Sequence, residues 1–472
     1  MREPPSETHL IAARLLLYNV YMIMLTRFRF TLTLFCVVAV MKLSAQMPVF
    51  EADSLMKHYT ARTAQLLDRR DALSAHYAID LFGVNIYAGA SEKAAGKPEY
   101  RVTWSELPIY KAILAHAPRE EAMRIMREKG SGPFSPEITK TYYQLGQHRD
   151  DDFSPSATMP LNGLRIALDP GHFASDSASS RVEDKYLDFK IAGSGADSIR
   201  INFFESKLTW QTATILAQQL RSAGAEVMFT REYGLTAFGK TYEQWKKEDY
   251  PHALDSMLKV RPNDPNLKKL KNTRLSQDDR LIFRFVFRDV ELRKRANLIN
   301  AFRPDLTVIL HYNVDETNTD WKRTTERNYN MAFTAGSFQA GELSDSEKRF
   351  DFLRLLLTDE LTESITFSGA VTRRFESELR VPLATPRDAT YLQNSCLQTG
   401  QPGVFCRNLS LCRLVQGTMV YGETLYQDNV NECTQLMKAA QTASPGPDAR
   451  TFQVAMAYYN GILDWAQAQP RE

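Results

Sequence analysis

Two histidines and two glutamates of this chain stand at positions where metal-dependent hydrolysis could be built. His172 closes the apolar run LRIALDPGH, and His311 ends a later apolar strand. Glu205 opens a predicted helix, and Glu423 comes two residues after the last predicted strand. Two histidines and one carboxylate with an open fourth position are the ligand set of a hydrolytic zinc site. We therefore expect zinc to be bound by His172, Glu205 and His311, with Glu423 free to act as a base.

The elements that must position these residues alternate between strands and helices. Predicted strands lie at 164–168, 225–230, 306–311, 328–334 and 417–421, and predicted helices at 206–222, 288–302, 344–362 and 449–465. Such alternation predicts an α/β fold, with a mostly parallel or mixed central sheet flanked by helices. Ligands of open α/β sheets bind beyond the carboxyl ends of the strands, so parallel strands would bring the four residues to one edge.

The N-terminal part of the chain predicts a targeting segment and a smaller helical domain. Residues 1–46 hold basic residues, a short apolar run and the small-residue sequence Leu43-Ser44-Ala45, which is typical of a signal peptide. We expect export to the periplasm or cell envelope, with a retained membrane anchor as the alternative. Residues 47–158 are predicted to be mainly helical, and an acidic and Ser-Pro stretch at 150–156 predicts a linker. The remaining residues, 159–472, would form the catalytic domain.

Composition limits the partners and suggests the compartment. A net charge of +2 over 472 residues lacks the basic excess that phosphate neutralisation requires, so we expect no nucleic-acid partner. Four of the five cysteines lie late in the chain, at Cys396, Cys406, Cys412 and Cys433. Their spacing matches no common zinc-finger pattern, so we expect disulfides, as in an exported protein, rather than a thiolate metal site. Their pairing is left open.

Taken in order, these residues resemble a known family, the zinc-dependent N-acetylmuramoyl-L-alanine amidases of the bacterial cell wall, in the branch that opens with a strand and Asp-Pro-Gly-His. The family places a metal-binding Glu at the start of a helix that ends in Gly before a strand closing in Thr-Arg, as Glu205 precedes Gly224 and Thr230-Arg231 here. Later matches to the family pattern are Arg295, Asn300, His311, Asn313, Glu423, Tyr426 and Asn429. The resemblance covers about residues 164–467.

This chain also departs from the family. The glycines that usually follow Asp-Pro-Gly-His are replaced by Phe173-Ala174-Ser175-Asp176, and the interval from His172 to Glu205 is long. The largest departure is an insertion at 232–289, between a strand and its next helix. A connection of this length is unusual in a compact domain. We therefore expect the insertion to cover or border the cleft, where it could limit access or bind a protein regulator.

The resemblance implies the reaction and the substrate. The reaction would be hydrolysis of the amide bond between the lactyl group of N-acetylmuramic acid and L-alanine in peptidoglycan, with zinc activating a water that Glu423 deprotonates. Arg295 and Asn313 would contact substrate or support the ligands, although Arg295 could instead be a structural residue on a helix surface. Two alternatives remain, a non-catalytic peptidoglycan-binding or regulatory protein on this fold, and a zinc peptidase. The sequence contains neither G-x-S-x-G nor H-E-x-x-H, which argues against a serine hydrolase and a zincin.

Overall fold

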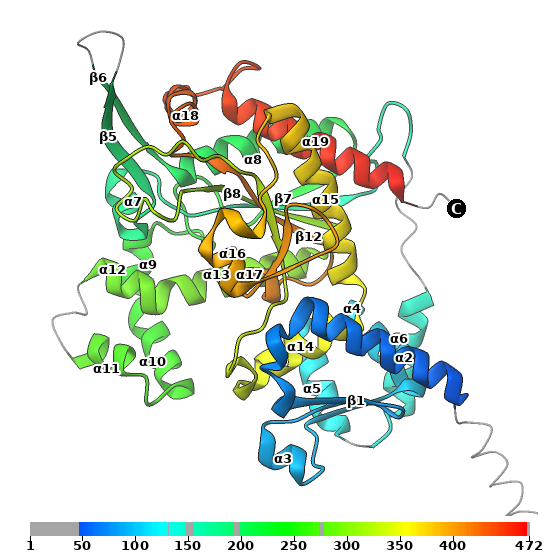
Figure 1. Cartoon of the computed structure of the whole chain (residues 1–472). Coiled ribbons are helices and arrows are strands. Elements are labelled where there is room, and N and C mark those ends of the chain that lie inside the picture. The colour runs from blue at the N-terminus through cyan, green and yellow to red at the C-terminus, as the bar shows by residue number, and fades with distance from the viewer. Residues whose placement is uncertain (1–46, 131, 148–154, 193–197, 273–277, 470–472) are drawn as a thin grey trace, which may run out of the picture.

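The computed structural model describes residues 47–469 except 131, 148–154, 193–197 and 273–277 (Figure 1). The predicted targeting segment, residues 1–46, lies outside the described residues. Within the described part of the chain, no helix has the length and apolar character needed to cross a membrane.

A seven-stranded mixed sheet forms the centre of the molecule, in the order β10-β11-β9-β12-β8-β4-β7. The strands are β4 (Arg165–Pro170), β7 (Glu226–Phe229), β8 (Leu306–Asn313), β9 (Met331–Thr334), β10 (Cys396–Gln398), β11 (Val404–Arg407) and β12 (Met419–Tyr426). β7, β4, β8 and β12 are parallel, β9 runs antiparallel to β12, and β10 pairs antiparallel with β11. The predicted α/β fold with a mixed sheet is confirmed.

Both faces of the sheet are covered, and the strand side chains divide between them with a period of two. In β4, Ile166 and Leu168 belong to one apolar cluster and Ala167 to the other. The first cluster is completed by α8 (Glu205–Ser222), α15 (Glu360–Leu379), α18 (Glu432–Gln441) and α19 (Arg450–Ala468), and the second by α13 (Arg288–Phe302) and α17 (Ser410–Leu414). Burial on both faces explains why these strands are continuous apolar runs rather than alternating ones.

The N-terminal region is helical as predicted, but it also contains a small antiparallel sheet that the sequence did not predict. Its helices are α2 (Val49–Arg62), α3 (Ala90–Ala94), α4 (Leu107–His116), α5 (Arg119–Lys129) and α6 (Pro136–Gln147), and its strands are β1 (Tyr77–Asp80), β2 (Gly83–Ile86) and β3 (Tyr100–Thr103). Apolar residues of this region join the second apolar cluster of the α/β region. The two regions therefore share one core, and a domain boundary near residue 158 stays a prediction.

A single predicted helix at 344–362 is two helices in the structure, α14 (Ser346–Leu357) and α15. α14 lies among the N-terminal elements (Figure 1). The guanidinium of Arg62 donates to the carbonyl oxygens of Leu355 at 3.1 Å and Thr358 at 2.7 Å. Since the last carbonyls of a helix have no partner within the helix, this contact satisfies them where α14 stops.

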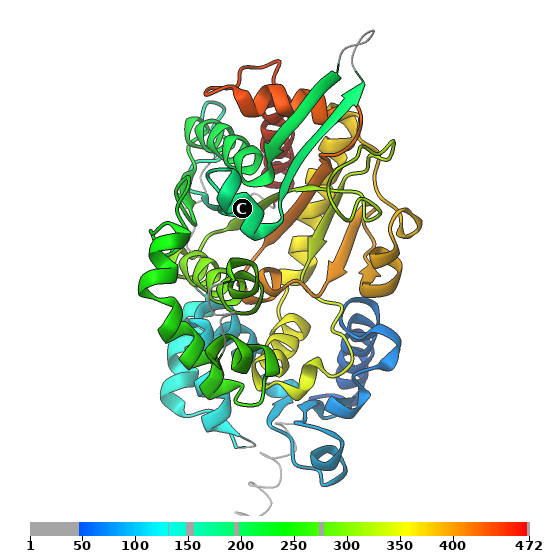
Figure 2. The ribbon, with the colours of Figure 1, turned by 90° about the vertical axis from the view of Figure 1, so that its left-hand side faces the viewer.

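Two segments in which no helix or strand was predicted flank the carboxyl edge of the sheet. The long interval after His172 forms α7 (Ser177–Glu183) and a hairpin of β5 (Tyr186–Ala192) and β6 (Ser198–Phe204), which lies at the opposite end of the molecule from the N-terminal region (Figure 2). The insertion forms the short helices α9 (Tyr242–Glu248), α10 (Tyr250–Val260), α11 (Pro265–Asn272) and α12 (Asp279–Ile282). The remaining helix, α16 (Thr390–Ser395), precedes β10.

The expectation of disulfides is wrong. Cys396, Cys406, Cys412 and Cys433 are all free and buried. Across the antiparallel pair, Cys396 faces Arg407 and Cys406 faces Leu397, so the two cysteines do not face each other. Burial raises the pKa of Cys396 to about 11 and that of Cys406 to about 12. These side chains act as small apolar core residues.

Candidate metal centre

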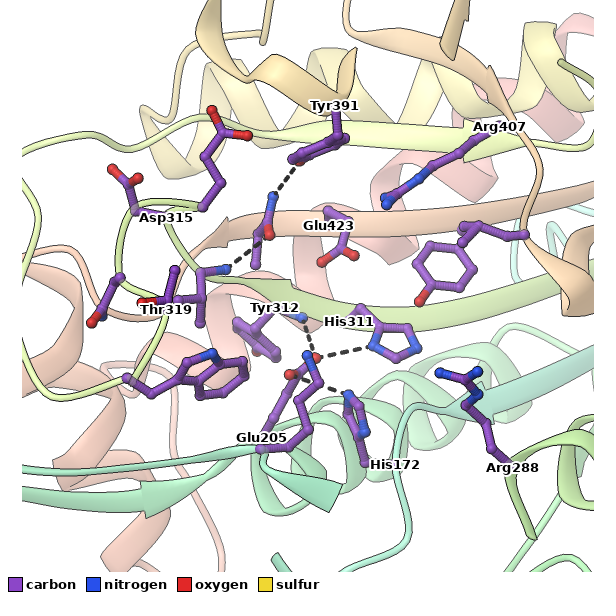
Figure 3. A pocket seen from close by; sticks show the side chains of 18 residues that line it. His172, Glu205, Arg288, His311, Tyr312, Asp315, Thr319, Tyr391, Arg407 and Glu423 are labelled. Atoms are coloured by element: carbon purple, nitrogen blue, oxygen red, sulfur yellow. Dashed lines mark hydrogen bonds and ion pairs between the residues drawn. The ribbon is translucent and has the colours of Figure 1, made fainter. Parts of the chain in front are cut away.

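Three of the residues singled out in the sequence meet at the carboxyl edge of the sheet (Figure 3). His172 follows β4, His311 lies in β8 and Glu205 is the first residue of α8. One ligand atom of each lies within 4.8 Å of those of the other two. Glu205 bridges the histidines, with its Oε2 at 3.2 Å from His172 Nε2 and its Oε1 at 3.0 Å from His311 Nδ1. The group can therefore present two nitrogens and one oxygen to a single cation.

Glu205 is fixed in place by the backbone and by a glutamine. Its side chain is 2% exposed. Oε1 accepts a bond from the Tyr312 amide at 3.1 Å, and Oε2 accepts one from Gln427 Nε2 at 3.2 Å. Burial alone would raise the pKa of Glu205, but the charge and hydrogen bonds of His172 and His311 hold it well below its usual range. The helix N-terminus also favours a carboxylate at this position.

The Asp-Pro-Gly-His turn lets the two histidines approach each other, because Gly171 has no side chain to stand between the turn and His311. A Cβ on Gly171 would lie 2.3 Å from His311 Cε1, so only glycine lets the imidazole pack against this backbone. His172 itself has a φ of 64°, in the left-handed region that non-glycine residues seldom adopt. Such strain persists where the surrounding structure holds it, and here it directs the His172 ring toward His311.

The carboxylate of Glu183, which the sequence did not single out, contacts the ring nitrogen of His172 that does not face Glu205. Glu183, at the end of α7, accepts bonds from His172 Nδ1 at 3.2 Å and from the amides of Phe173 at 3.1 Å and Ala174 at 3.0 Å. A carboxylate on the outer nitrogen fixes the tautomer and the orientation of a metal-binding imidazole. Glu183 lies in the long interval between His172 and Glu205, and nothing in its spacing distinguishes it from the other acidic residues of that interval.

Glu423 lies beside the three residues, but inside a strand rather than after one. β12 extends through Glu423, which pairs with His311 on one side and Met331 on the other. The predicted strand end at residue 421 was therefore too early. Burial raises the pKa of Glu423 to about 8, with a further contribution from the Glu205 carboxylate. Glu423 lines the cavity described below, and its Oε2 is enclosed and has no hydrogen-bond partner among the described residues.

The group opens into a cavity of about 510 Å³. Its lining includes His172, Glu205, His311, Asn313, Tyr391, Arg407, Tyr421 and Glu423. The Tyr421 ring stacks on His311 with centroids 4.5 Å apart. A cavity of several hundred Å³ with a few convergent polar groups is the usual form of a small-molecule site.

A family model described as N-acetylmuramoyl-L-alanine amidase matches residues 166–446. The chain belongs to this family. A relative in Bacillus subtilis (strain 168), YrvJ, named as a candidate N-acetylmuramoyl-L-alanine amidase, is 40% identical over 96 residues, and this match spans 20% of the present chain and 15% of YrvJ.

Similar solved structures include the amidase Ami1 from Mycobacterium smegmatis, with 15% identity and a TM-score of 0.34 over 65% of this chain and 99% of that one. Another is the CwlD amidase from Clostridioides difficile, solved in complex with the GerS lipoprotein, with 13% identity and a TM-score of 0.33 over 65% of this chain and 100% of that one.

Among the other residues matched to the amidase pattern, Arg295 is buried rather than on a helix surface. It is 3% exposed, and its guanidinium lies 3.3 Å from Asp169 and 3.0 Å from Glu291. It also donates to the carbonyls of Pro170 at 3.1 Å and His172 at 2.9 Å. Arg295 therefore supports the Asp-Pro-Gly-His turn from the core.

Asn313 lines the amidase cavity, but its polar atoms bond within the protein. Its Nδ2 donates to Tyr391 Oη at 3.0 Å, and its Oδ1 accepts from the Val314 amide at 2.8 Å. Tyr426 is a core residue, and Asn429 Oδ1 accepts from the amide of Glu432, at the start of α18. These contacts favour positioning roles for the late residues of the amidase pattern.

The insertion stands at the border of the amidase cavity. Of its described residues, Arg288 lines the cavity. Arg288, Phe283 and Phe287 together line a neighbouring apolar pocket. Its helices have their own apolar cluster, into which Phe173 packs with its ring centroid 5.1 Å from that of Phe287. Phe173 thus joins the insertion to the backbone of the adjacent His172.

We expect Arg295→Met to destabilise the protein by about 3–5 kcal/mol, because it leaves the buried carboxylates of Asp169 and Glu291 without their counter-charge. The measurement is the free energy of unfolding in urea. The control is Arg124→Met, which breaks an exposed pair with Glu128 and should cost at most about 1 kcal/mol. Equal losses in the two variants would contradict a supporting role for Arg295.

Proposed function

We propose that this protein hydrolyses the amide bond between N-acetylmuramic acid and L-alanine in peptidoglycan, using zinc held by His172, Glu205 and His311. The observation that carries the proposal is the convergence of these three side chains in the lining of one cavity, together with Glu423. Membership of the amidase family supports the substrate class.

The donor set fits zinc. Imidazole nitrogen and carboxylate oxygen are both common zinc ligands, and catalytic zinc sites keep three protein ligands with one position open. No further histidine, cysteine or carboxylate joins the group within the described part of the chain, and the group faces the cavity. The absence of a fourth protein ligand favours a catalytic over a structural site.

The protein's own residues supply proton transfer and orientation. When bound, zinc supplies a Lewis acid that lowers the pKa of water to about 7. The positive charge of bound zinc would favour the ionised form of Glu423. The Glu423 carboxylate takes a proton from the attacking water, whose oxygen adds to the amide carbonyl carbon. Glu423 then gives the proton to the alanine nitrogen as the carbon–nitrogen bond breaks, leaving a lactyl carboxylate and a free amino terminus. Glu183 keeps His172 oriented throughout.

The proposed function also suggests where the protein acts, and the position of the insertion suggests how it could be regulated. Peptidoglycan lies outside the cytoplasm, so we propose that the protein is exported and that residues 1–46 direct this. The insertion borders the cavity at Arg288, and its helices contact the segment after His172 through Phe173. A protein regulator that binds residues 232–289 could therefore reach the site without entering it.

Digestion of purified peptidoglycan by the zinc-loaded protein tests the function. We expect mass spectrometry to find new L-alanine amino termini and intact glycan strands, because only the lactyl amide is cut. New termini within the stem peptide would instead identify a zinc peptidase. Binding without any new terminus, on several peptidoglycan types, would identify a non-catalytic binding protein.

A further inference from the structure

Three cationic side chains line the cavity of the candidate metal centre, and none of them forms an ion pair among the described residues, although the charges of two of them, Lys185 and Arg407, lower the pKa of Glu423. They are Lys185, Arg288 and Arg407. Among the described residues, no acidic group lies within ion-pair distance of any of the three. Charged groups that are left unpaired at a pocket are available to a ligand of opposite charge.

Arg407 is the most firmly held of the three. It is the last residue of β11, and its guanidinium lies over the rings of Phe333, at 4.8 Å from the centroid, and Tyr391, at 4.6 Å. The Tyr391 hydroxyl oxygen accepts a hydrogen bond from Asn313 Nδ2 at 3.0 Å. The contact with two rings fixes the position of the guanidinium, and no hydrogen bond from its N–H groups is found within the described part of the chain, which leaves them for a planar anion.

The acidic residues of the same cavity are already engaged. Asp315 accepts bonds from Thr317 at 2.9 Å and Thr325 at 2.7 Å. Glu316 accepts bonds from the amide and the hydroxyl of Thr390, at 2.8 Å and 2.7 Å. These bonds leave both carboxylates charged, but Asp315 is also paired with Arg327 at 3.7 Å, and the three cations outnumber the two carboxylates of the lining away from the metal ligands and Glu423.

The position of Arg407 relative to Glu423 indicates which part of a substrate it meets. Arg407 lies beside Glu423, whereas Arg288 lies beside His172 and His311 (Figure 3). In the reaction proposed above, Glu423 protonates the leaving alanine nitrogen, so the leaving peptide lies on the Glu423 side. An extended residue spans about 3.5 Å, so the residue after alanine would lie about that far beyond the scissile nitrogen, on the side where Arg407 lines the cavity.

We propose that Arg407 binds the carboxylate nearest to the alanine on the leaving peptide, and so selects muramoyl peptides whose second residue carries a free α-carboxylate. This inference rests on the proposed function for the direction of the substrate. A guanidinium–carboxylate pair of this kind is planar and bidentate, and the cation–π contacts with Phe333 and Tyr391 hold the guanidinium ready for it.

The test compares two substrates that differ only in this group, muramoyl-L-alanyl-D-glutamate and its α-amide. We expect wild type to hydrolyse the acid with kcat/KM about 10- to 100-fold above that of the amide, because a bond to a charged group is lost. Arg407→Gln should bring the ratio close to one by slowing hydrolysis of the acid. Arg407→Lys, which keeps the charge but not the planar group, should give an intermediate ratio.

Arg288→Gln is the matched control. It removes one positive charge from the other side of the cavity and should keep the preference for the acid. Equal loss of the preference in Arg288→Gln and Arg407→Gln would overturn the assignment to Arg407 in favour of a general effect of charge. Equal hydrolysis of the acid and the amide by wild type would overturn the subsite while leaving the amidase function intact.

A binding measurement separates this inference from the proposed function. Titration calorimetry of the zinc-loaded wild type with L-alanyl-D-glutamate and its α-amide should show tighter binding of the acid, and Arg407→Gln should lose this difference. Selective binding without hydrolysis of either muramoyl peptide would support the subsite and contradict the amidase function. Indifferent binding of the two peptides would overturn the subsite, whatever the activity. Circular dichroism melting of each variant verifies that it is folded.

Discussion

Glu423→Gln is expected to keep its zinc and its fold while hydrolysing muramoyl-L-alanine amides about 10²- to 10⁴-fold more slowly than wild type. The substitution keeps the size of the side chain but removes its ability to take a proton. Glu423 lies next to His311 in the sheet, and its Oε2 has no hydrogen-bond partner within the described residues. The backbone contacts that place it do not depend on its charge, so the fold should survive.

The measurement is kcat/KM on a soluble muramoyl peptide, together with zinc content. Glu316→Gln is a suitable control, because Glu316 also lines the cavity but its carboxylate accepts bonds from Thr390. It should lose less than tenfold in rate, as expected of a group outside the chemistry. If Glu423→Gln were as active as wild type, the base would have to be another residue.

Substitution of His172 or His311 by alanine should abolish both stoichiometric zinc and hydrolysis. The three candidate ligands come from separate elements, and Glu205 alone cannot replace the lost nitrogen. Zinc is to be measured by mass spectrometry of the dialysed protein, with melting temperatures recorded for the apo and zinc-loaded forms. Zinc should raise the melting temperature of wild type, since a ligand that binds only the folded state stabilises it, and it should not do so in these variants.

His58→Ala is the matched control for the ligand variants. His58 is exposed and lies outside the three-residue group, so this variant should bind zinc as wild type does. Near-stoichiometric zinc in both His172→Ala and His311→Ala would show that the metal lies elsewhere. Loss of zinc in His58→Ala would point to a general effect of histidine removal rather than to a defined site.

The elements that position the site were largely predictable from the sequence. The helix predicted at 288–302 agrees with α13, and the strand predicted at 306–311 is β8, which continues to Asn313. The physical reason is local, because apolar runs bounded by turn residues and helical spacing of apolar residues reflect the neighbouring chain. Parallel strands then bring residues at their carboxyl ends to one edge. This is why His172, His311 and Glu423 could be expected together before the structure was known.

Sequence-based predictions failed where contacts between distant segments, rather than the local pattern of residues, set the end of an element or the environment of a side chain. β12 continues past residue 421 because β8 and β9 supply hydrogen-bond partners on both sides of Glu423. The helix predicted at 344–362 ends early where Arg62 binds the last carbonyls of α14. The four late cysteines lie apart in the core, and cysteine spacing alone cannot tell core residues from disulfide partners.

The sequence by itself determined the chemistry that this protein can perform, since residue types and their order along alternating strands and helices supply two imidazoles and two carboxylates at one sheet edge. Only the tertiary structure decided how these groups are supported and what surrounds them. Glu183 behind His172, Arg295 beneath the turn and Arg407 on the rings of Phe333 and Tyr391 all act through contacts between distant segments. Such contacts depend on packing in three dimensions, which leaves no periodic signal in the chain.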